Sequence, residues 1–348
     1  MRILVDITHP AHVHFFRHAI GRWQAAGHEV RITSRDKDIT VALLDEFGFE
    51  HTCIGHLRAG ITGRGIELIE RALALGRMVR QFRPHIATAW SGTFLVYGCL
   101  PYRVPTVVFG DVEHDRFSNM LTYPLATAVV TARSYTKSIG KKHVRYDGNP
   151  NLAYTHPNVF TPDPSVLATE GLCLGEPFTI IRLVSWQAVH DIGDYGVRDL
   201  RVVIETLAPY GRILLSSEKP LPPDLQPLSL RGPRRNMLHL QAFARLYFGE
   251  SATMASECAM LGTPSIFVST SKRGYIDELQ TRYGMVYSFN DRQTGQNQAL
   301  VKARELLENP ETPAQWQSKR QRMLAELIDV TEFITRIVPQ YARGIERS

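Results

Sequence analysis

Residues 246–268, LYFGESATMASECAMLGTPSIFV, contain two apolar runs separated by a helix-forming segment. The first run ends at Phe248, and Gly249 lets the chain turn sharply before a helix predicted over 252–261. The run PSIFVS then predicts the next strand. Because two parallel strands need a crossover connection, usually a helix, this order predicts an α/β fold with a parallel sheet.

The same alternation of apolar runs and amphipathic segments is found on both sides of this stretch. In the second half, helices are predicted over 196–208 and near 275–283, and strands at 178–186, 212–217, 244–249, 264–269 and 285–289. In the first half, helices are predicted at about 14–26, 38–48 and 117–126, and strands include 2–7, 29–34, 85–90, 105–111 and 128–132. The chain therefore predicts two doubly wound parallel sheets.

The length of 348 residues is more than one hydrophobic core usually serves, so two domains are expected. Prolines, asparagines and glycines interrupt the pattern between 148 and 177 and favour a linker there. We predict two Rossmann-like domains that face a cleft, with the last helix packing back across the first domain. The predicted boundaries are an N-terminal acceptor domain 1–160, a linker 161–177, a nucleotide-sugar domain 178–325 and a C-terminal helix 326–348.

Composition narrows the classes of ligand and compartment. The formal charge of +6 favours an anionic partner, but no block of Lys and Arg stands out, so nucleic acid is not expected. Phosphate-bearing metabolites and anionic membrane surfaces remain as the candidate anionic partners. Four scattered cysteines without ligand spacing disfavour disulfides and a zinc site. The absence of a secretory signal pattern and of a long apolar segment predicts a cytoplasmic protein.

The turn after Gly249 is the clearest candidate for ligand binding. Small side chains at Ser251, Ala252 and Thr253 would let backbone N–H groups and the helix dipole approach a phosphate or diphosphate. Glu257, farther along the helix, could accept hydrogen bonds from sugar hydroxyls. In the alternative interpretation Ser251 is only a helix N-cap and Glu257 a solvated side chain.

Histidines follow the first predicted strand in the stretch THPAHVHFF. His12 and His14 fall on the turn and first helical positions, where a histidine could act as general base toward a hydroxyl or bind phosphate when protonated. His14 could equally be a packing residue. No acidic partner nearby completes a metal-binding set with these histidines, so no metal is expected.

Three further strand ends carry ionisable side chains. Asp111 and Glu113 follow the apolar run PTVVF at 105–109, and carboxylates this close should raise one pKa into the range of an acid or base. Arg182 lies in an apolar strand and needs a partner, either a ligand or a salt bridge. Asp277 could reach donor sugar hydroxyls, or belong to a solvated helix face.

The segment ESATMASECAMLGTPSIFV resembles the nucleotide-sugar segment of GT-B glycosyltransferases, in particular the peptidoglycan N-acetylglucosaminyl transferase. This resemblance implies that Ser251 to Thr253 hold a UDP diphosphate and that Glu257 holds the ribose. The stretch LVSWQA resembles the Ser-Gln turn of that family, which implies donor binding by Ser185 and Gln187. Arg182 and Gly249 are included in the same expected donor site.

Two segments of the first half extend this resemblance to the acceptor side. HPAHVHF implies that His12 matches the acceptor-side histidine of the family. FGDVEHDRFSNMLTYPLA occupies the place of its acidic loop, which implies a role for Asp111 or Glu113 and for Asn119.

A closer resemblance spans nearly the whole chain. DITHPAHVHFF, FTPDPSVL, IIRLVSWQAVHDIGDYG and GESATMASECAMLGTPSIF resemble the GT-B-like family called domain of unknown function 354. That family is related to the peptidoglycan transferase and to UDP-GlcNAc 2-epimerases. The resemblance implies a GT-B fold with two Rossmann-like domains.

Together these features predict a metal-independent glycosyltransferase that moves a sugar from a nucleotide sugar, expected to be a UDP-sugar, to a glycan or lipid-linked acceptor, without a cofactor. Fixed dipoles and positive charge would stabilise the departing diphosphate. The amphipathic segment 61–84, rich in arginine, could touch the inner membrane surface or simply pack on the sheet. The alternatives are a 2-epimerase or hydrolase of the same fold, or a protein that binds a nucleotide sugar without catalysis.

Overall fold

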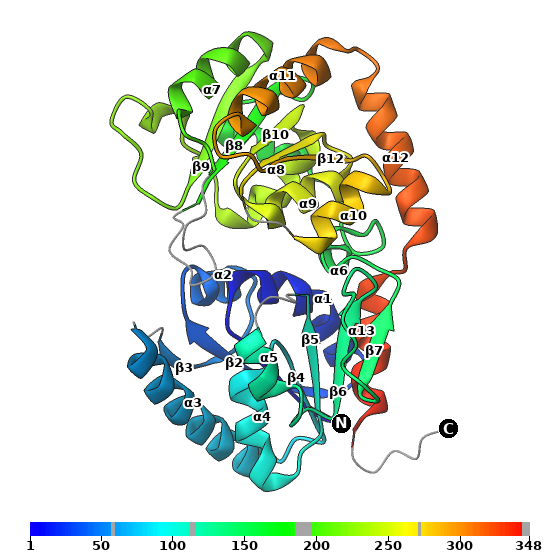
Figure 1. Ribbon diagram of the computed structural model, residues 1–348. Coiled ribbons are helices and arrows are strands. Elements are labelled where there is room, and N and C mark those ends of the chain that lie inside the picture. The colour runs from blue at the N-terminus through cyan, green and yellow to red at the C-terminus, as the bar shows by residue number, and fades with distance from the viewer. Residues whose placement is uncertain (57–59, 112–115, 185–195, 271–272, 343–348) are drawn as a thin grey trace. The chain divides into compact units, whose positions relative to one another are not determined.

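The computed structural model describes residues 1–56, 60–111, 116–184, 196–270 and 273–342. The chain forms two compact units. Unit 1 contains Met1–Val159 and the described chain from Ile328 onward, and unit 2 contains Phe160–Leu327. Each unit has one parallel sheet with helices packed against it, as predicted (Figure 1).

The sheet of unit 1 has seven strands in the order β3-β2-β1-β4-β5-β6-β7. Four of its five inner strands, β1, β4, β5 and β6, are almost continuously buried, as expected where helices cover both faces. The edge strands β3, which is largely exposed, and β7, which is mostly half-buried, were not predicted. The strands are β1 (Arg2–Ile7), β2 (Glu29–Asp36), β3 (Thr52–His56), β4 (Ile86–Trp90), β5 (Thr106–Gly110), β6 (Ala128–Ala132) and β7 (His143–Tyr146).

The helices of unit 1 form two groups. Helices α2, α6 and α13 each contact α1, and α4 contacts both α3 and α5 in the second group. Helix α1 begins at Pro10, earlier than predicted, because His9 caps it and its Nδ1 accepts the Ala11 N–H (3.2 Å). The helices are α1 (Pro10–Ala25), α2 (Thr40–Glu46), α3 (Gly60–Phe82), α4 (Thr93–Cys99), α5 (Arg116–Thr122), α6 (Leu152–Thr155) and α13 (Val330–Gln340).

The sheet of unit 2 has five strands in the order β12-β11-β10-β8-β9, and all five were predicted. They are β8 (Phe178–Leu183), β9 (Arg212–Ser217), β10 (Leu246–Gly249), β11 (Ser265–Val268) and β12 (Val286–Phe289). The helices are α7 (Leu200–Leu207), α8 (Met237–Phe243), α9 (Ala252–Leu261), α10 (Gly274–Thr281), α11 (Gly295–Glu308) and α12 (Thr312–Glu326).

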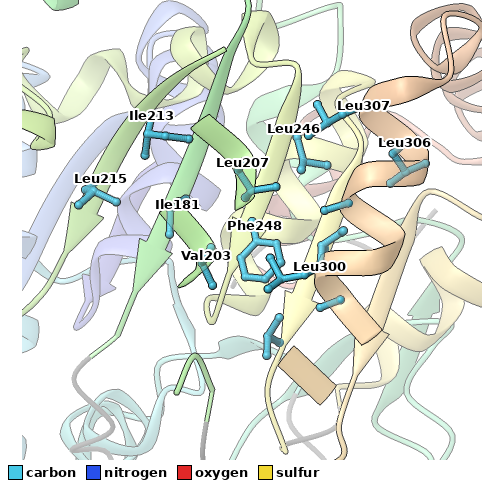
Figure 2. Close-up of a cluster of buried hydrophobic side chains, with 14 of the residues drawn as sticks. Ile181, Val203, Leu207, Ile213, Leu215, Leu246, Phe248, Leu300, Leu306 and Leu307 are labelled. Carbon is cyan, nitrogen blue, oxygen red and sulfur yellow. The ribbon is translucent and has the colours of Figure 1, made fainter. Parts of the chain in front are cut away.

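One hydrophobic cluster fixes the central strands of unit 2 against α7 and α11 (Figure 2). Phe248 of β10 lies among Val203 and Leu207 of α7 and Leu300 of α11. All four side chains are at most 5% exposed. Burial at about 25 cal/mol per Å² of apolar surface makes this cluster a main source of the stability of unit 2. Its members Ile181 and Phe248 lie near the ends of β8 and β10, next to the candidate site.

The last helix packs on the first unit, as predicted. Trp23 of α1 donates its indole N–H to the Thr335 carbonyl of α13 (3.1 Å). Asp329 caps α13, accepts the Glu332 N–H (2.9 Å) and lies 3.8 Å from the Arg22 guanidinium. The end of the chain therefore completes the layer of helices around α1.

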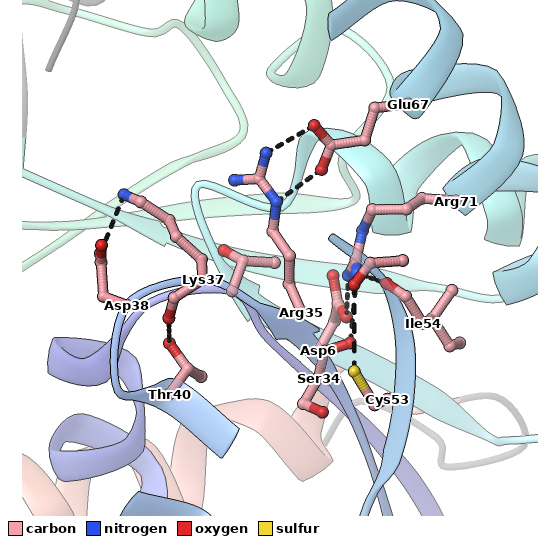
Figure 3. A network of polar contacts seen from close by, with 12 residues as sticks. Asp6, Ser34, Arg35, Lys37, Asp38, Thr40, Cys53, Ile54, Glu67 and Arg71 are labelled. Atoms are coloured by element: carbon pink, nitrogen blue, oxygen red, sulfur yellow. Dashed lines mark hydrogen bonds and ion pairs between the residues drawn. The ribbon is translucent and has the colours of Figure 1, made fainter. Parts of the chain in front are cut away.

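A buried ionic network attaches α3 to the sheet of unit 1 (Figure 3). Arg71 donates to Asp6 Oδ1 (2.9 Å) and to the Ser34 carbonyl (3.2 Å), and both charged side chains are 1% exposed. Glu67 accepts two hydrogen bonds from Arg35 (2.5 and 2.7 Å). Since a buried charge without a partner is very costly, these contacts determine the position of α3.

His14 packs between two aromatic rings of unit 1. Its ring centroid is 5.2 Å from that of Tyr154 and 5.8 Å from that of Phe47. The Nδ1 atom is buried and has no hydrogen-bond partner among the described residues. Burial lowers the pKa of His14 to about 3, and the charges of Arg17 and His18 add to the shift.

We predict that Arg71→Met lowers the free energy of unfolding by about 3–5 kcal/mol, because it leaves the Asp6 carboxylate buried without its ion-pair partner. Urea denaturation measures this change. The double variant Asp6→Asn/Arg71→Met should recover at least half of the loss. Arg77→Met, on the exposed face of the same helix, is the control and should change stability by less than about 0.5 kcal/mol. Equal losses in the Arg71 and Arg77 variants would contradict the role of the network.

A second prediction concerns pH. Since the pKa of His14 is about 3 in the folded chain and about 6.5 when unfolded, the unfolded chain binds the proton more readily. The stability that neutral His14 supports is full above pH 6.5 and falls as the pH decreases from 6.5 toward 3. His14→Phe keeps the aromatic packing and removes the titration. As the pH decreases from 6.5 toward 3, the unfolding free energy of this variant should fall by about 1.4 kcal/mol per pH unit less than that of the unmodified chain. Parallel pH curves would refute the prediction.

Candidate functional site

The turn between β10 and α9 is held by a buried tyrosine. Tyr247 Oη accepts the Ser251 N–H (3.2 Å) and donates to the Ser251 carbonyl (3.0 Å). Ser251 is the N-cap of α9, and its Oγ accepts the Met254 N–H (3.3 Å). Ser251, Ala252 and Thr253 are partly exposed, whereas the rest of α9 is buried. The first turn of this helix is therefore its accessible part.

Gly249 is required for close packing rather than for an unusual backbone conformation. Its φ is not in the left-handed region, so the conformational reason expected from the sequence does not apply. A Cβ at this position would lie 2.5 Å from the Arg182 carbonyl oxygen and 2.9 Å from the Arg182 nitrogen. The glycine lets β10 run directly beside the end of β8.

Glu257 is buried at 6% exposure, which excludes the alternative of a solvated side chain. Its Oε2 accepts a hydrogen bond from the Gln241 side-chain amide of α8 (2.9 Å). Gln241 is itself fully buried, and its backbone carbonyl accepts the Thr263 hydroxyl (2.7 Å). The carboxylate is therefore fixed in direction one and a half turns beyond the accessible start of α9.

Glu250 belongs to this site but was not predicted from the sequence. It follows Gly249 directly and is 7% exposed. Its two carboxylate oxygens accept the Val184 N–H and the Val197 N–H, both at 2.7 Å. One side chain in the β10–α9 turn thus holds the chain just after β8 and the chain just before α7. The signal in the sequence was an acidic residue between a strand-ending glycine and a helix N-cap.

Two other predicted donor residues lie near the ends of their elements in unit 2. Arg182 pairs with Glu218 (2.6 Å) and donates to Ser216 Oγ (2.8 Å), so it has the protein partners that the salt-bridge alternative required. Its Nε is buried without a partner in the described part of the chain. Asp277 is exposed in the first turn of α10. Ser185 and Gln187 lie outside the described residues.

His12 lies in the first turn of α1, beside the end of β4. Its ring centroid is 6.1 Å from that of Trp90 and 5.6 Å from that of His9. The Thr8 N–H points to Nδ1 at 3.4 Å, and the Thr8 hydroxyl is 3.3 Å from the same atom. Burial lowers the pKa of His12 well below its usual range, and the positive charges of His9, Lys37 and Arg35 add to this effect.

The lowered pKa separates the two roles considered for His12. At neutral pH the ring is uncharged, which suits a general base and not a phosphate-binding imidazolium. Thr8 can pair with either tautomer, because its hydroxyl can accept a hydrogen bond from a protonated Nδ1, whereas its N–H donates a hydrogen bond to an unprotonated Nδ1. When the proton is on Nδ1, Nε2 carries the lone pair that a base needs.

The remaining acceptor-side candidates are only partly described. Asp111 directly follows β5, and its charge, together with burial, raises the pKa of Tyr146 well above its usual range. Asn119 of α5 lines a surface hollow with Tyr123 and Met120. Glu113 lies outside the described residues. His14 is part of the aromatic packing of unit 1.

Within the described ranges, no three His, Cys, Asp or Glu side chains are grouped so that they could bind a metal ion. None of the helices in that part of the chain is both long and apolar enough to cross a membrane.

Comparison with known sequences identifies the family. Residues 1–343 match the family described as Protein of unknown function (DUF354). An uncharacterized protein of Methanocaldococcus jannaschii is 24% identical over 188 residues. That alignment covers 52% of this chain and 55% of the relative, so the chain spans about half the length of the curated protein it matches.

Solved structures of low sequence identity share the fold. UDP-GlcNAc 2-epimerase from Neisseria meningitidis, bound to UDP-GlcNAc, has a TM-score of 0.65 at 11% identity. The superposition covers 96% of this chain and 98% of that chain. The spinosyn rhamnosyltransferase SpnG, in complex with spinosyn aglycone, has a TM-score of 0.60 at 13% identity, with 96% of this chain and 99% of that chain covered. The UDP-GlcNAc 2-epimerase of Methanocaldococcus jannaschii has a TM-score of 0.65 at 11% identity, with 97% of this chain and 99% of that chain covered.

At these identities the likeness shows the architecture, which glycosyltransferases and 2-epimerases have in common. The match over residues 1–343 and the two parallel sheets agree with the resemblance seen in the sequence. The chain belongs to the DUF354 family and has the GT-B fold.

Proposed function

We propose that this chain is a glycosyltransferase that takes a UDP-sugar as donor and transfers the sugar to a glycan or lipid-linked acceptor. One observation carries the proposal: the accessible first turn of α9 lies at the end of the central strand β10, and the buried carboxylate of Glu257, farther along α9, is directed by Gln241 of α8. A helix N-terminus favours a diphosphate, and a fixed carboxylate favours ribose hydroxyls.

The donor site then consists of Gly249, Ser251, Ala252, Thr253 and Glu257. Gly249 keeps the turn close to β8, and the N–H groups at the start of α9 face the diphosphate. The unpartnered Nε of Arg182 and the exposed carboxylate of Asp277 are further donor contacts in this proposal. Ser185 and Gln187 retain the donor role that the family resemblance implies.

On the acceptor side, neutral His12 acts as the base, and Asp111 or Glu113 is the alternative. The base takes the proton of an acceptor hydroxyl, whose oxygen forms a bond to the anomeric carbon of the sugar. The bond between that carbon and the diphosphate oxygen breaks, and UDP leaves with the electron pair. The dipole of α9 stabilises the negative charge on the leaving diphosphate, so the step is proposed without a metal ion.

A 2-epimerase is the second candidate, and the likeness in fold to solved UDP-GlcNAc 2-epimerases supports it. Such an enzyme would use the same donor turn, but it would move a proton at the carbon next to the anomeric centre and would need no acceptor.

We predict that one nucleotide sugar, expected to be a UDP-sugar, raises the melting temperature of the purified chain. At a hundred times the dissociation constant it should add about 2.7 kcal/mol of stability. The assay compares UDP-, GDP-, dTDP- and CMP-sugars by differential scanning fluorimetry. Glu257→Gln should remove most of the shift, because it removes the charge that receives the ribose hydroxyls.

Glu170→Gln is the matched control for this assay. Glu170 is also a buried carboxylate of unit 2, at 1% exposure, and accepts the Arg231 and Gly232 N–H groups away from α9. Its variant should lose stability but keep the full ligand shift. No shift with any nucleotide sugar, or an equal loss of the shift in both variants, would contradict the proposed donor site.

Product analysis separates the candidate activities. The transferase proposal predicts no change of UDP-GlcNAc without an acceptor, whereas an epimerase would form the C2 epimer, which proton NMR detects. With an acceptor present, His12→Gln should reduce transfer at least a hundredfold and leave the thermal shift intact. Epimer formed by the acceptor-free protein would replace the transferase proposal with the second candidate, and binding without any product would favour a non-catalytic protein.

A further inference from the structure

A basic surface hollow lies between α5 and the segment that joins β6 to β7. Its volume is about 770 Å³, and Lys137, Lys141 and Lys142 contribute to its lining together with Met120 and Ile139. The lining residues that the structure describes include no aspartate or glutamate. All three lysines are exposed. The hollow is therefore positively charged and partly apolar.

The segment that carries these lysines is unusually basic for this chain. Residues 133–146, RSYTKSIGKKHVRY, contain no acidic residue, and their cations are Arg133, Lys137, Lys141, Lys142 and Arg145. The five cations are spread over thirteen positions, so they form no continuous basic block in the sequence. Lys137, Lys141 and Lys142 come together at the hollow, whereas Arg133 is paired with Asp147 (3.0 Å).

Backbone contacts hold this segment in place. Arg145 donates to the Thr136 carbonyl (3.2 Å) and to the Lys137 carbonyl (3.1 Å). Lys142 donates from Nζ to the Pro124 carbonyl (2.6 Å). Tyr135 and Tyr123, at 5% and 9% exposure, form the buried side of the hollow. The lysines are thus presented by an ordered segment over a buried aromatic floor.

Helix α5 adds an apolar surface next to these charges. Phe117 is 68% exposed and Met120 is 66% exposed. Residues three apart in a helix lie on the same face, so Phe117 extends the apolar lining that Met120 provides. Two large apolar side chains this exposed lie beside a basic hollow, an arrangement that suits a molecule with both an anionic and an apolar part.

We propose that this hollow binds the phosphate group of an amphiphile, whose hydrocarbon part lies along Phe117 and Met120. Several lysine ammonium groups suit the charge of a phosphate monoester, which is close to −2 at neutral pH. The site is made of unit 1 residues alone and does not depend on the proposed donor site in unit 2.

Isothermal titration calorimetry of the full chain tests the proposal with three probes. They are inorganic phosphate, octyl phosphate and octyl glucoside, the two octyl compounds each below its critical micelle concentration. Octyl phosphate should bind at least tenfold more tightly than either of the others. Lys137→Ala/Lys141→Ala should weaken its binding at least tenfold. The control Lys219→Ala/Arg304→Ala removes the same charge from exposed positions of unit 2 and should leave binding unchanged.

The apolar half of the site has its own variant. Phe117→Ser/Met120→Ser replaces exposed side chains and should reduce the affinity for octyl phosphate to that for inorganic phosphate. If the unmodified chain bound octyl phosphate and inorganic phosphate equally tightly, the apolar part would not contribute to binding. The hollow would then be a site for a free anion and not for an amphiphile. If the unmodified chain bound octyl glucoside as tightly as octyl phosphate, or if the lysine variant bound octyl phosphate unchanged, the hollow would not recognise the phosphate group and the proposal would be wrong. Loss of the nucleotide-sugar shift with octyl phosphate binding intact would count only against the donor site.

Discussion

Both units bury charged groups near the carboxyl ends of their central strands, and each charge must be compensated inside the protein. In unit 1 Asp6 of β1 is paired with Arg71 of α3. In unit 2 Glu250, just after β10, receives two backbone N–H groups. Since an uncompensated buried charge costs several kcal/mol, comparable with the whole stability of a domain, these contacts restrict where α3 and the β10–α9 turn can lie.

The compensated charges stand directly beside the groups proposed to act on ligands. Glu250 precedes Ser251, the N-cap of α9, and Asp6 lies two residues before Thr8, the partner of His12. A site built this way is preorganised, because its supporting groups already have their partners before a ligand arrives. The same principle applies to Glu257, whose direction is set by Gln241.

Most of the fold could be predicted because inner parallel strands are continuous apolar runs, as in RILVDI and FTIIRL. The strands β3 and β7 could not, because their short sequences TCIGH and HVRY contain no continuous apolar run. Glu250 could not be predicted as a structural carboxylate, since its partners are backbone N–H groups that no side-chain pattern marks. The burial of Glu257 follows from the packing of α8 and α9, which spacing within one helix does not reveal.

The position of α13 has a consequence for how the chain acquires its structure during translation. The Trp23 indole and its acceptor on Thr335 are 312 residues apart in sequence, and all of unit 2 is synthesised between them. Unit 2 is continuous and can close its core while α13 is still being made. Unit 1 emerges first from the ribosome and is completed last, with the surface of α1 around Trp23 uncovered in the interval.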